Sequence, residues 1–318
     1  MLYKNISKKF RDSLCRRFDY NPNIFYFSSD DFKGLNKKEY SFYSSKGHIL
    51  KGNLYYYDNY KDKRIIIFEH GLGAGHLAYM KEINLLCEKG YLVLAYDHSG
   101  CGASGGDSTY GFAQSLNDLD DCVKSLKASS LFKDYDISVI GHSWGAYAAL
   151  NISSFHELRN IIAISGFISV KAIIAQYFSS ILSIYRKKIY NECLLENEKY
   201  VSANAIDSLK KTKAKVLVIH SKDDKTVSFK RHFKVLSRAL EGYLNIKFMA
   251  LEGKDHNPNY TKEAIEYKDK FFKDLKFVLK KDLIKSEEDS IKFKKKYDWN
   301  KMTEQDMIVW EEIFKYLE

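Results

Sequence analysis

Short apolar runs alternate along most of this chain with stretches whose apolar residues recur every three or four positions. The runs are continuous, which is typical of strands buried on both faces of a sheet. They lie at Arg64 to Phe68, Tyr91 to Tyr96, Ile137 to Ile140, Ile161 to Ile164, Val216 to Ile219 and Ile246 to Leu251. The helical spacing covers Tyr79 to Lys89, Phe112 to Leu126, Trp144 to Phe155, Phe229 to Leu240 and Thr261 to Leu279. This alternation predicts an α/β fold, a mostly parallel sheet flanked by helices.

The regions outside this alternation predict the domain organisation. Alternating apolar residues between Glu39 and Tyr57 predict a β-hairpin with its turn at Lys46-Gly47-His48. Between Phe167 and Lys213 the apolar residues are too widely spread for a helix with one buried stripe, so we expect a small helical lid. The predicted parts are an N-terminal helical arm (1–36), a core (37–166 and 214–280), the lid (167–213) and a C-terminal helical extension (281–318).

Composition excludes several classes of protein. The 318 residues carry a formal charge of +10, but the lysines are interleaved with acidic residues, so we expect no nucleic-acid partner. The five cysteines lack a C-x-x-C pair and predict neither a disulfide framework nor a zinc site. We expect no integral membrane segment, because no eighteen residues in a row are apolar. The basic N-terminus lacks the apolar stretch of a secretory signal, which favours a cytoplasmic location.

One pentapeptide lies at a predicted junction between strand and helix. Gly141-His142-Ser143-Trp144-Gly145 follows the run that ends at Ile140 and leads into the helical pattern that begins at Trp144. A strand that turns sharply into a helix crowds its backbone, and glycines fit beside a serine held in a strained conformation. Alone, the pentapeptide is equally consistent with an ordinary serine in a glycine-rich turn. A nucleophilic serine also needs a base and a group that orients the base.

Residues of both kinds follow two later predicted strands. Asp223 and Asp224 come after the strand that ends at Ile219, and His256 follows the strand that ends at Leu251. Both residue types therefore follow strands, where a base and its orienting carboxylate are needed. The residues alone leave either aspartate as the partner of the histidine.

These stretches together resemble the α/β-hydrolase family, in particular its serine aminopeptidase-like and monoglyceride-lipase-like branch. The resemblance covers about Lys46 to Leu279. It includes His70-Gly71-Leu72-Gly73 at the place of the family's oxyanion loop, and Asp97 to Ser104, which is similar to D-x-R-G-x-G-x-S. The chain departs from the family pattern at Ser99, where arginine is usual, and at Ser221, where glycine is usual.

The resemblance implies a role for each matching residue. It implies Ser143 as the nucleophile and His256 as the general base and then acid. Asp224 rather than Asp223 is implied as the orienting carboxylate, because the family pattern H-G-x-x-D-x-x-V maps onto His220 to Val227. The implied oxyanion donors are the backbone N–H groups of Leu72 and Trp144.

The remaining polar candidates are expected to be structural. His70 is expected to support the oxyanion loop, His142 is the variable position of the pentapeptide, and His220 ends a strand. Surface or helix-cap positions are expected for five further histidines, namely His48, His76, His98, His156 and His232. A solvated helical face, rather than a metal cluster, is expected for Asp118, Asp120 and Asp121.

The function expected from the resemblance is a serine hydrolase, carboxylesterase-like, that cleaves an ester-type bond of a small acyl or aryl substrate through an acyl-enzyme. Such a mechanism requires neither a cofactor nor a metal. Tyr177 and Phe178 of the apolar lid are expected to bind the substrate. Peptidase, lipase, thioesterase and acyltransferase activities use the same residues, and a non-catalytic ligand-binding protein on this scaffold also stays open.

Overall fold

The computed structural model describes residues 12–61, 63–73 and 75–318. Its centre is one eight-stranded sheet with the strand order β1-β2-β4-β3-β5-β6-β7-β8. The strands are β1 (Asn36–Tyr43), β2 (Ile49–Tyr56), β3 (Arg64–Glu69), β4 (Leu92–Tyr96), β5 (Asp136–His142), β6 (Asn160–Ile164), β7 (Lys215–Ser221) and β8 (Ile246–Leu251). Every strand predicted from an apolar run is present, and so is the hairpin.

The sheet is mixed at one edge and parallel elsewhere. β1 and β2 form the antiparallel hairpin, and Gly47 at its turn has φ of 88°, a conformation that favours glycine. β2 pairs antiparallel with β4, whereas the neighbours from β4 to β8 all pair in parallel. All residues of β4 and β6 are buried, as the continuous apolar runs predicted.

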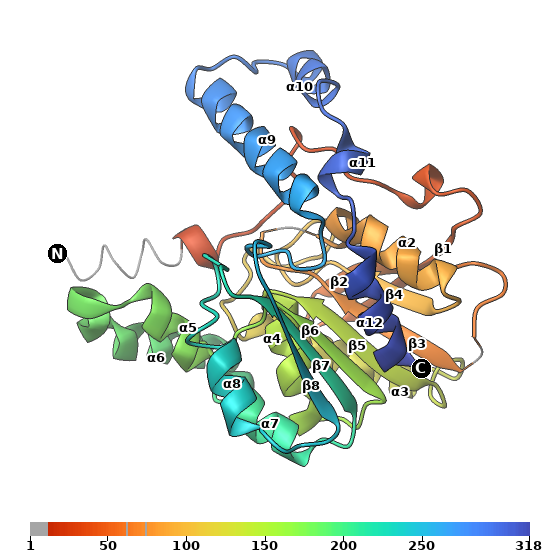
Figure 1. Ribbon diagram of the computed structural model, residues 1–318, viewed down its shortest axis with the longest axis vertical. Helices are drawn as coiled ribbons and strands as arrows, with labels where there is room; N and C mark the ends of the chain where they lie inside the picture. Colours follow the sequence, from red (N-terminus) through yellow and green to blue (C-terminus); the bar gives the residue numbers. More distant parts are fainter. Residues whose placement is uncertain (1–11, 62, 74) are drawn as a thin grey trace.

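Helices cover both faces of this sheet (Figure 1). The α-helices are α2 (Met80–Glu88), α3 (Gln114–Ala128), α4 (Trp144–Asn151), α5 (Val170–Tyr177), α6 (Arg186–Val201), α7 (Ala205–Lys211), α8 (Phe233–Ala239), α9 (Lys262–Lys280), α10 (Glu287–Lys294), α11 (Trp299–Met302) and α12 (Met307–Leu317). Short 3₁₀ helices are η1 (Ser29–Asp31), η2 (His76–Tyr79), η3 (Ile152–Ser154) and η4 (Ser180–Tyr185). None of the helices in the described ranges is both long and apolar enough to cross a membrane.

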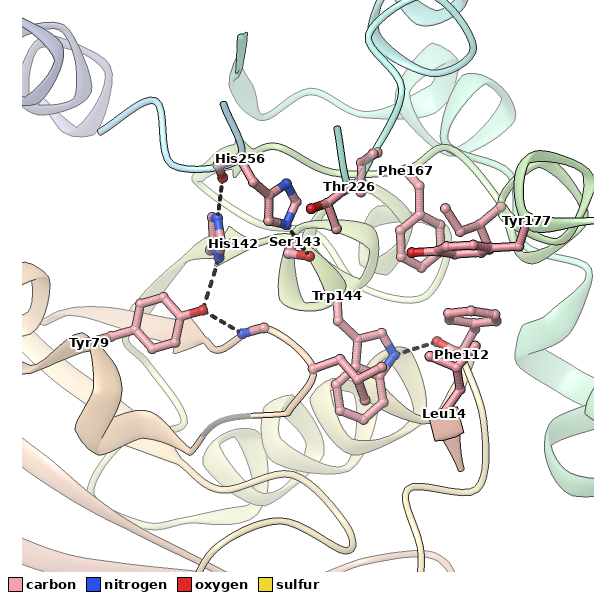
Figure 2. Close-up of a pocket in the computed structure, with 14 residues that line it drawn as sticks. Leu14, Tyr79, Phe112, His142, Ser143, Trp144, Phe167, Tyr177, Thr226 and His256 are labelled. Carbon is pink, nitrogen blue, oxygen red and sulfur yellow. Dashed lines mark hydrogen bonds between the residues drawn. The ribbon is translucent and has the colours of Figure 1, made fainter. Parts of the chain in front are cut away.

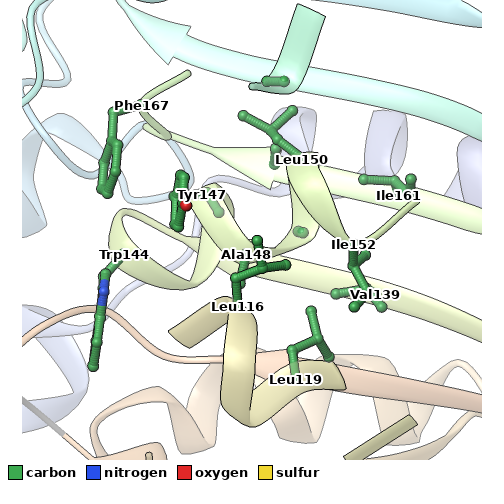
Figure 3. Close-up of a cluster of buried hydrophobic side chains, with 14 of the residues drawn as sticks. Leu116, Leu119, Val139, Trp144, Tyr147, Ala148, Leu150, Ile152, Ile161 and Phe167 are labelled. Atoms are coloured by element: carbon green, nitrogen blue, oxygen red, sulfur yellow. The ribbon is translucent and has the colours of Figure 1, made fainter. Parts of the chain in front are cut away.

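The core is divided between the two faces according to the alternation of side chains along each strand. Ile65 and Ile67 of β3 pack against the side covered by α3, α4, α7 and α8. Figure 3 shows other members of this cluster, among them Leu116 of α3 and Ala148 of α4. Ile66 and Phe68 face α2 and α12 on the other side. The C-terminal helix α12 therefore belongs to the sheet's own core, and it buries Trp310 completely.

Residues 15–35 do not form the helix predicted for the N-terminal arm, apart from the short η1. From residue 12 onward, helix is limited to a turn at residues 12–14 and to η1, while Arg16 and Phe18 form isolated bridges with Ser108 and Cys101. The Arg17 guanidinium donates to three backbone carbonyls of the loop after β4, at distances of 2.6–2.9 Å. Residues 12–20 are here named the N-terminal strap, and from Arg16 to Phe18 the strap is extended because its partners lie in that loop. Residues 1–11 of the predicted arm lie outside the described range.

The prediction of a solvated acidic face on α3 is wrong. Asp118, Asp120 and Asp121 are all buried. Asp118 accepts hydrogen bonds from the backbone N–H and the hydroxyl of Ser99, and Asp120 accepts from Tyr200 of α6. The helix is covered on this side by the loop after β4 and by α6, which the local sequence pattern does not reveal.

Three histidines expected at the surface or at caps are also buried, namely His76, His98 and His232. Each has a polar partner or neighbour. His76 lies 2.7 Å from Asp97, His98 lies between Glu69 and Asp118, and His232 contacts Gln176. Polar side chains are tolerated inside the fold where a partner offsets the loss of hydration.

Candidate active site

Ser143 occupies the turn between β5 and α4. Its φ of 55° and ψ of −109° lie outside the regions that residues with a Cβ prefer. The turn is tight because two glycine backbones approach their neighbours closely. A Cβ on Gly141 would lie 2.3 Å from the Gly145 carbonyl oxygen, and one on Gly145 would lie 2.1 Å from the Glu69 carbonyl oxygen. The two glycines therefore permit the strained serine, as the sequence predicted.

The structure brings Ser143, His256 and Asp224 into one hydrogen-bonded line. The Ser143 hydroxyl donates to His256 Nε2 over 2.8 Å, and His256 Nδ1 donates to Asp224 Oδ2 over 2.8 Å. The serine comes from the elbow after β5, the aspartate from the loop after β7, and the histidine from the loop after β8. Parallel strands place these three loops at the same edge of the sheet.

Asp224 is held in its ionised form. Burial alone would raise its pKa, but hydrogen bonds from His220 and His256 outweigh burial and lower the pKa below its usual range. Its second oxygen, Oδ1, accepts the backbone N–H groups of Thr226 and Val227, each over 2.8 Å. These contacts fix the carboxylate and leave one oxygen for the imidazole.

Asp223, the other aspartate considered from the sequence, has a different position. It is exposed, and its Oδ1 accepts the hydroxyl of Ser221 over 2.5 Å and the backbone N–H of Gly253 over 2.8 Å. The N–H of Asp255 donates to its other oxygen over 3.2 Å. Asp223 therefore ties the loop that carries His256 to the end of β7. Ser221, which replaces the family's glycine, takes part in this tie.

The backbone N–H groups of Leu72 and Trp144 both belong to residues that line the pocket around Ser143. Trp144 is the first residue of α4, so its N–H has no partner inside the helix. The loop that contains Leu72 is fixed by His70, whose Nδ1 donates to the Gly71 carbonyl and whose Nε2 accepts the His98 backbone N–H. Burial and the nearby charge of His98 lower the pKa of His70 to about 3, so it stays neutral.

A second hydrogen-bonded line connects the loop that contains Leu72 to the loop that carries His256 (Figure 2). The Tyr79 hydroxyl accepts the Gly71 N–H over 3.0 Å and donates to His142 Nδ1 over 2.9 Å. His142 Nε2 in turn donates to the backbone carbonyl of His256 over 2.8 Å. Burial, followed by the charge of His256, lowers the pKa of His142 to about 3, which keeps the ring neutral and the line intact. The sequence did not indicate this role for either residue.

We expect Tyr79→Phe to lower kcat by about 10- to 100-fold with little change in KM. The variant leaves the Gly71 N–H and His142 Nδ1 without their buried hydrogen-bond partner. Each unpaired buried group costs about 1–3 kcal/mol of free energy, and we expect this cost to displace the loops that hold Leu72 and His256. Steady-state kinetics on a p-nitrophenyl ester would separate kcat from KM. Tyr91→Phe is the matched control, because the buried Tyr91 hydroxyl has no hydrogen-bond partner among the described residues. Equal losses in both variants would show that Tyr79 acts through general stability.

The pocket at Ser143 has a volume of about 210 Å³ and a mainly apolar wall. Tyr177 of α5 lines it and stacks on Phe112 at 6.3 Å between ring centroids, as Figure 2 shows. Phe178, predicted beside it, is instead packed in the core and does not line this pocket, because the helix ends at Tyr177 and turns the next side chain inward. Leu14 of the N-terminal strap completes the wall, which the sequence did not indicate.

Three ionisable side chains are buried behind Trp144. His98 lies 3.2 Å from Glu69 and 3.3 Å from Asp118, and its ring centroid is 4.9 Å from that of Trp144. Burial favours the neutral imidazole, but the two carboxylates outweigh it and raise the pKa of His98 to about 9. Ser99, at the family's arginine position, donates to Asp118 and extends this cluster. Across the described residues, no group of His, Cys, Asp or Glu has an arrangement that could hold a metal ion.

Comparison with known proteins gives two kinds of similarity. The family model for serine aminopeptidase S33 matches residues 60–202. The chain is 31% identical over 146 residues to the uncharacterized protein YqkD of Bacillus subtilis (strain 168). The aligned residues make up 46% of this chain and 45% of that protein. It is 23% identical over 225 residues to the uncharacterized protein R595 of Acanthamoeba polyphaga mimivirus, covering 65% of this chain and 72% of that protein.

Solved structures share the fold. The structure of the Pyrococcus furiosus esterase Pf2001 aligns with a TM-score of 0.58 and 22% sequence identity. The alignment covers 83% of this chain and 97% of the esterase chain. The structure of the acylaminoacyl peptidase of Pyrococcus horikoshii aligns with a TM-score of 0.53 and 19% sequence identity. That alignment covers 71% of this chain and 38% of the peptidase chain. Together with the order of strands in the sheet, these similarities show that the chain has the α/β-hydrolase fold, and residues 60–202 are similar to the serine aminopeptidase S33 family.

Proposed function

We propose that this protein is a serine hydrolase that cleaves ester-type bonds of small acyl or aryl substrates. The observation that carries the proposal is the hydrogen-bonded line from Ser143 through His256 to Asp224, which opens into a mainly apolar pocket. A serine hydroxyl becomes a useful nucleophile when a neutral imidazole accepts its proton and a carboxylate stabilises the resulting imidazolium.

The proposed reaction has two stages. In the first, Ser143 Oγ attacks the ester carbonyl while its proton moves to His256 Nε2, and the developing oxyanion is bound by the N–H groups of Leu72 and Trp144. The tetrahedral intermediate collapses when His256 returns the proton to the departing alkoxide, which leaves an acyl-enzyme. In the second, His256 takes a proton from water, which attacks the acyl carbonyl. Collapse then returns that proton to Ser143 Oγ and releases the acid.

The wall of the pocket favours an ester over an aminopeptidase substrate. Its described lining residues include no Asp, Glu, Lys or Arg. An aminopeptidase must bind the free ammonium group of its substrate, and a buried ammonium requires a paired acidic group. The apolar rings of Phe112, Phe167 and Tyr177 suit an acyl or aryl group instead. The similar structures include both an esterase and an acylaminoacyl peptidase, so they do not distinguish the two activities. We therefore base the choice of an ester substrate on the residues that line the pocket.

The test is hydrolysis of p-nitrophenyl esters of graded acyl length by the purified protein, with a fluorophosphonate probe alongside. We expect measurable turnover of the short esters and covalent labelling by the probe. Turnover of an aminoacyl-p-nitroanilide in preference to every ester would favour a peptidase. Absence of both turnover and labelling would favour a non-catalytic binding protein.

Acyl-chain preference provides a prediction about the pocket wall. Each buried methylene contributes about 0.8 kcal/mol, so kcat/KM should rise about fourfold per methylene until the pocket is full. We expect Tyr177→Ser to flatten this rise while labelling by a small fluorophosphonate continues. The control is Ile184→Ser, an exposed apolar position on the same insertion that does not line the pocket. If the two variants changed the chain-length profile equally, Tyr177 would not be part of the acyl site.

A further inference from the structure

A second cavity lies on the far side of Tyr79 from Ser143. Its volume is about 340 Å³, larger than that of the catalytic pocket, and Tyr79 lines both. Its walls come from Asn21 and residues 24–27, from Gly73 and residues 77–79, and from α9 and α11. Figure 1 shows the red chain before β1 running past the ends of α9 and α11. Nothing in the proposed hydrolase mechanism uses this cavity.

The cavity is largely aromatic and open to solvent. Its apolar lining includes Phe25, Phe27, Phe271, Phe272, Trp299 and Met302. The rings form a connected group, with centroid distances of 5.0 Å from Phe271 to Trp299 and 6.0 Å from Phe25 to Trp299. Phe25 and Phe272 remain 38% and 44% exposed, so apolar surface is still available to a ligand. An aryl or alkyl group would remove that surface from water.

Among the described residues that line this aromatic cavity, Lys268 is the one cation. Lys268 of α9 donates from Nζ to Asn257 Oδ1 over 3.2 Å, and Nζ lies 5.1 Å from the centroid of the Tyr260 ring. In the described ranges no carboxylate lies within ion-pair distance of this ammonium. Burial lowers the pKa of Lys268, whereas Glu82 and Asp269 act on it from a distance in the opposite direction. The ammonium is therefore partly shielded from water, and the carboxylates that act on it do so without direct contact.

A second donor lies beside this cation. The Oδ1 atom of Asn257 is occupied by Lys268, and its Nδ2 has no assigned acceptor over the described part of the chain. Nζ and Nδ2 together present two donors, which match the two oxygens of one carboxylate. A doubly charged phosphate group would need more cationic groups than this cavity offers.

We propose that this cavity binds an amphipathic monocarboxylate, with the carboxylate on Lys268 and Asn257 and an aryl or alkyl body among the aromatic rings. The site is distinct from the catalytic pocket and does not depend on hydrolase activity. The two cavities are connected through two residues. Tyr79 lines both of them, and Asn257 of the second cavity directly follows His256 of the first in the sequence. An occupant of the second cavity would therefore contact residues that position the histidine and oxyanion loops.

The first experiment uses the unmodified full chain and two ligands of equal shape. Isothermal titration calorimetry would compare 2-naphthoate with its neutral analogue 2-naphthamide. We expect 2-naphthoate to bind at least about tenfold more tightly, because hydrogen bonds to a charged group are stronger than neutral ones. A change in Trp299 emission should accompany binding. Equal affinity for the two ligands, or no binding of 2-naphthoate, would overturn the proposal without any variant.

Variants then locate the site. Lys268→Met should remove the preference for the acid, and Lys268→Arg should retain most of it. Lys270→Met is the matched control on the same helix, at an exposed position outside the cavity, and should bind as the wild type does. Phe272→Ser should weaken 2-naphthoate, whereas Tyr177→Ser in the catalytic pocket should not. Loss of binding in Tyr177→Ser but not in Phe272→Ser would assign the ligand to the catalytic pocket and refute the proposal.

Discussion

Ser143→Ala should lower kcat on a p-nitrophenyl ester by a factor on the order of 10⁶ and abolish fluorophosphonate labelling. The variant removes the oxygen that would form the acyl-enzyme, and no other hydroxyl is hydrogen-bonded to His256 among the described residues. Alanine retains a Cβ, so the unusual backbone at φ of 55° and the surrounding fold should persist. The measurement is steady-state turnover together with labelling of intact protein followed by mass spectrometry.

Ser165→Ala provides the matched control for this experiment. Ser165 is also buried and also has φ of 55°, but its hydroxyl has no hydrogen-bond partner in the described structure. We expect this variant to keep wild-type turnover and labelling. If Ser143→Ala were still labelled in full, the probe would be reacting elsewhere and the assignment of the nucleophile would be lost.

Asp224→Asn should reduce kcat by about 10⁴ through the wrong imidazole tautomer. The two backbone N–H groups of Thr226 and Val227 would retain the amide oxygen of the new side chain, which turns its NH₂ group toward His256. That group donates, so His256 Nδ1 would have to accept and Nε2 would carry the proton. The imidazole could then no longer take the proton of Ser143. Pre-steady-state release of p-nitrophenol would measure the loss in the acylation step.

The neighbouring carboxylate serves as the control. Asp223→Asn should have a much smaller effect, because Asp223 contacts Ser221 and the backbone of the histidine loop but not the imidazole. Its amide oxygen can still accept most of those N–H groups. A larger loss in Asp223→Asn than in Asp224→Asn would contradict the orientation of His256 described above.

The features predicted successfully from the sequence depend on local patterns. Apolar runs and helical spacing located β3 to β8 and the main helices, because a strand buried on both faces requires continuous apolar residues. The elbow at Ser143 was recognisable because close backbone packing needs glycines at fixed positions around it. Asp224 could be preferred over Asp223 only through the family pattern, since adjacent residues of equal chemistry differ only in the direction that the folded loop gives them.

The features that sequence reasoning missed depend on contacts between distant segments. Tyr79 and His142 are 63 positions apart, and neither pattern nor spacing indicates that one hydroxyl joins two loops. The acidic residues of α3 seemed solvated because a polar helical face normally is, and only α6 and the loop after β4 cover them. Phe178 followed the helical periodicity of α5 in the sequence, but α5 ends one residue earlier.

The N-terminal strap forms part of the wall of the pocket at Ser143, although it does not belong to the sheet. Leu14 forms part of the pocket wall, and Arg17 contacts carbonyls that are 85–89 positions away, yet the strap adds no strand to the sheet. Its release would break a few hydrogen bonds and apolar contacts while the sheet stays folded. Amide hydrogen exchange in the loop after β4 would then follow release of the strap and not global unfolding. We therefore expect the width of the pocket to vary with the local stability of the strap.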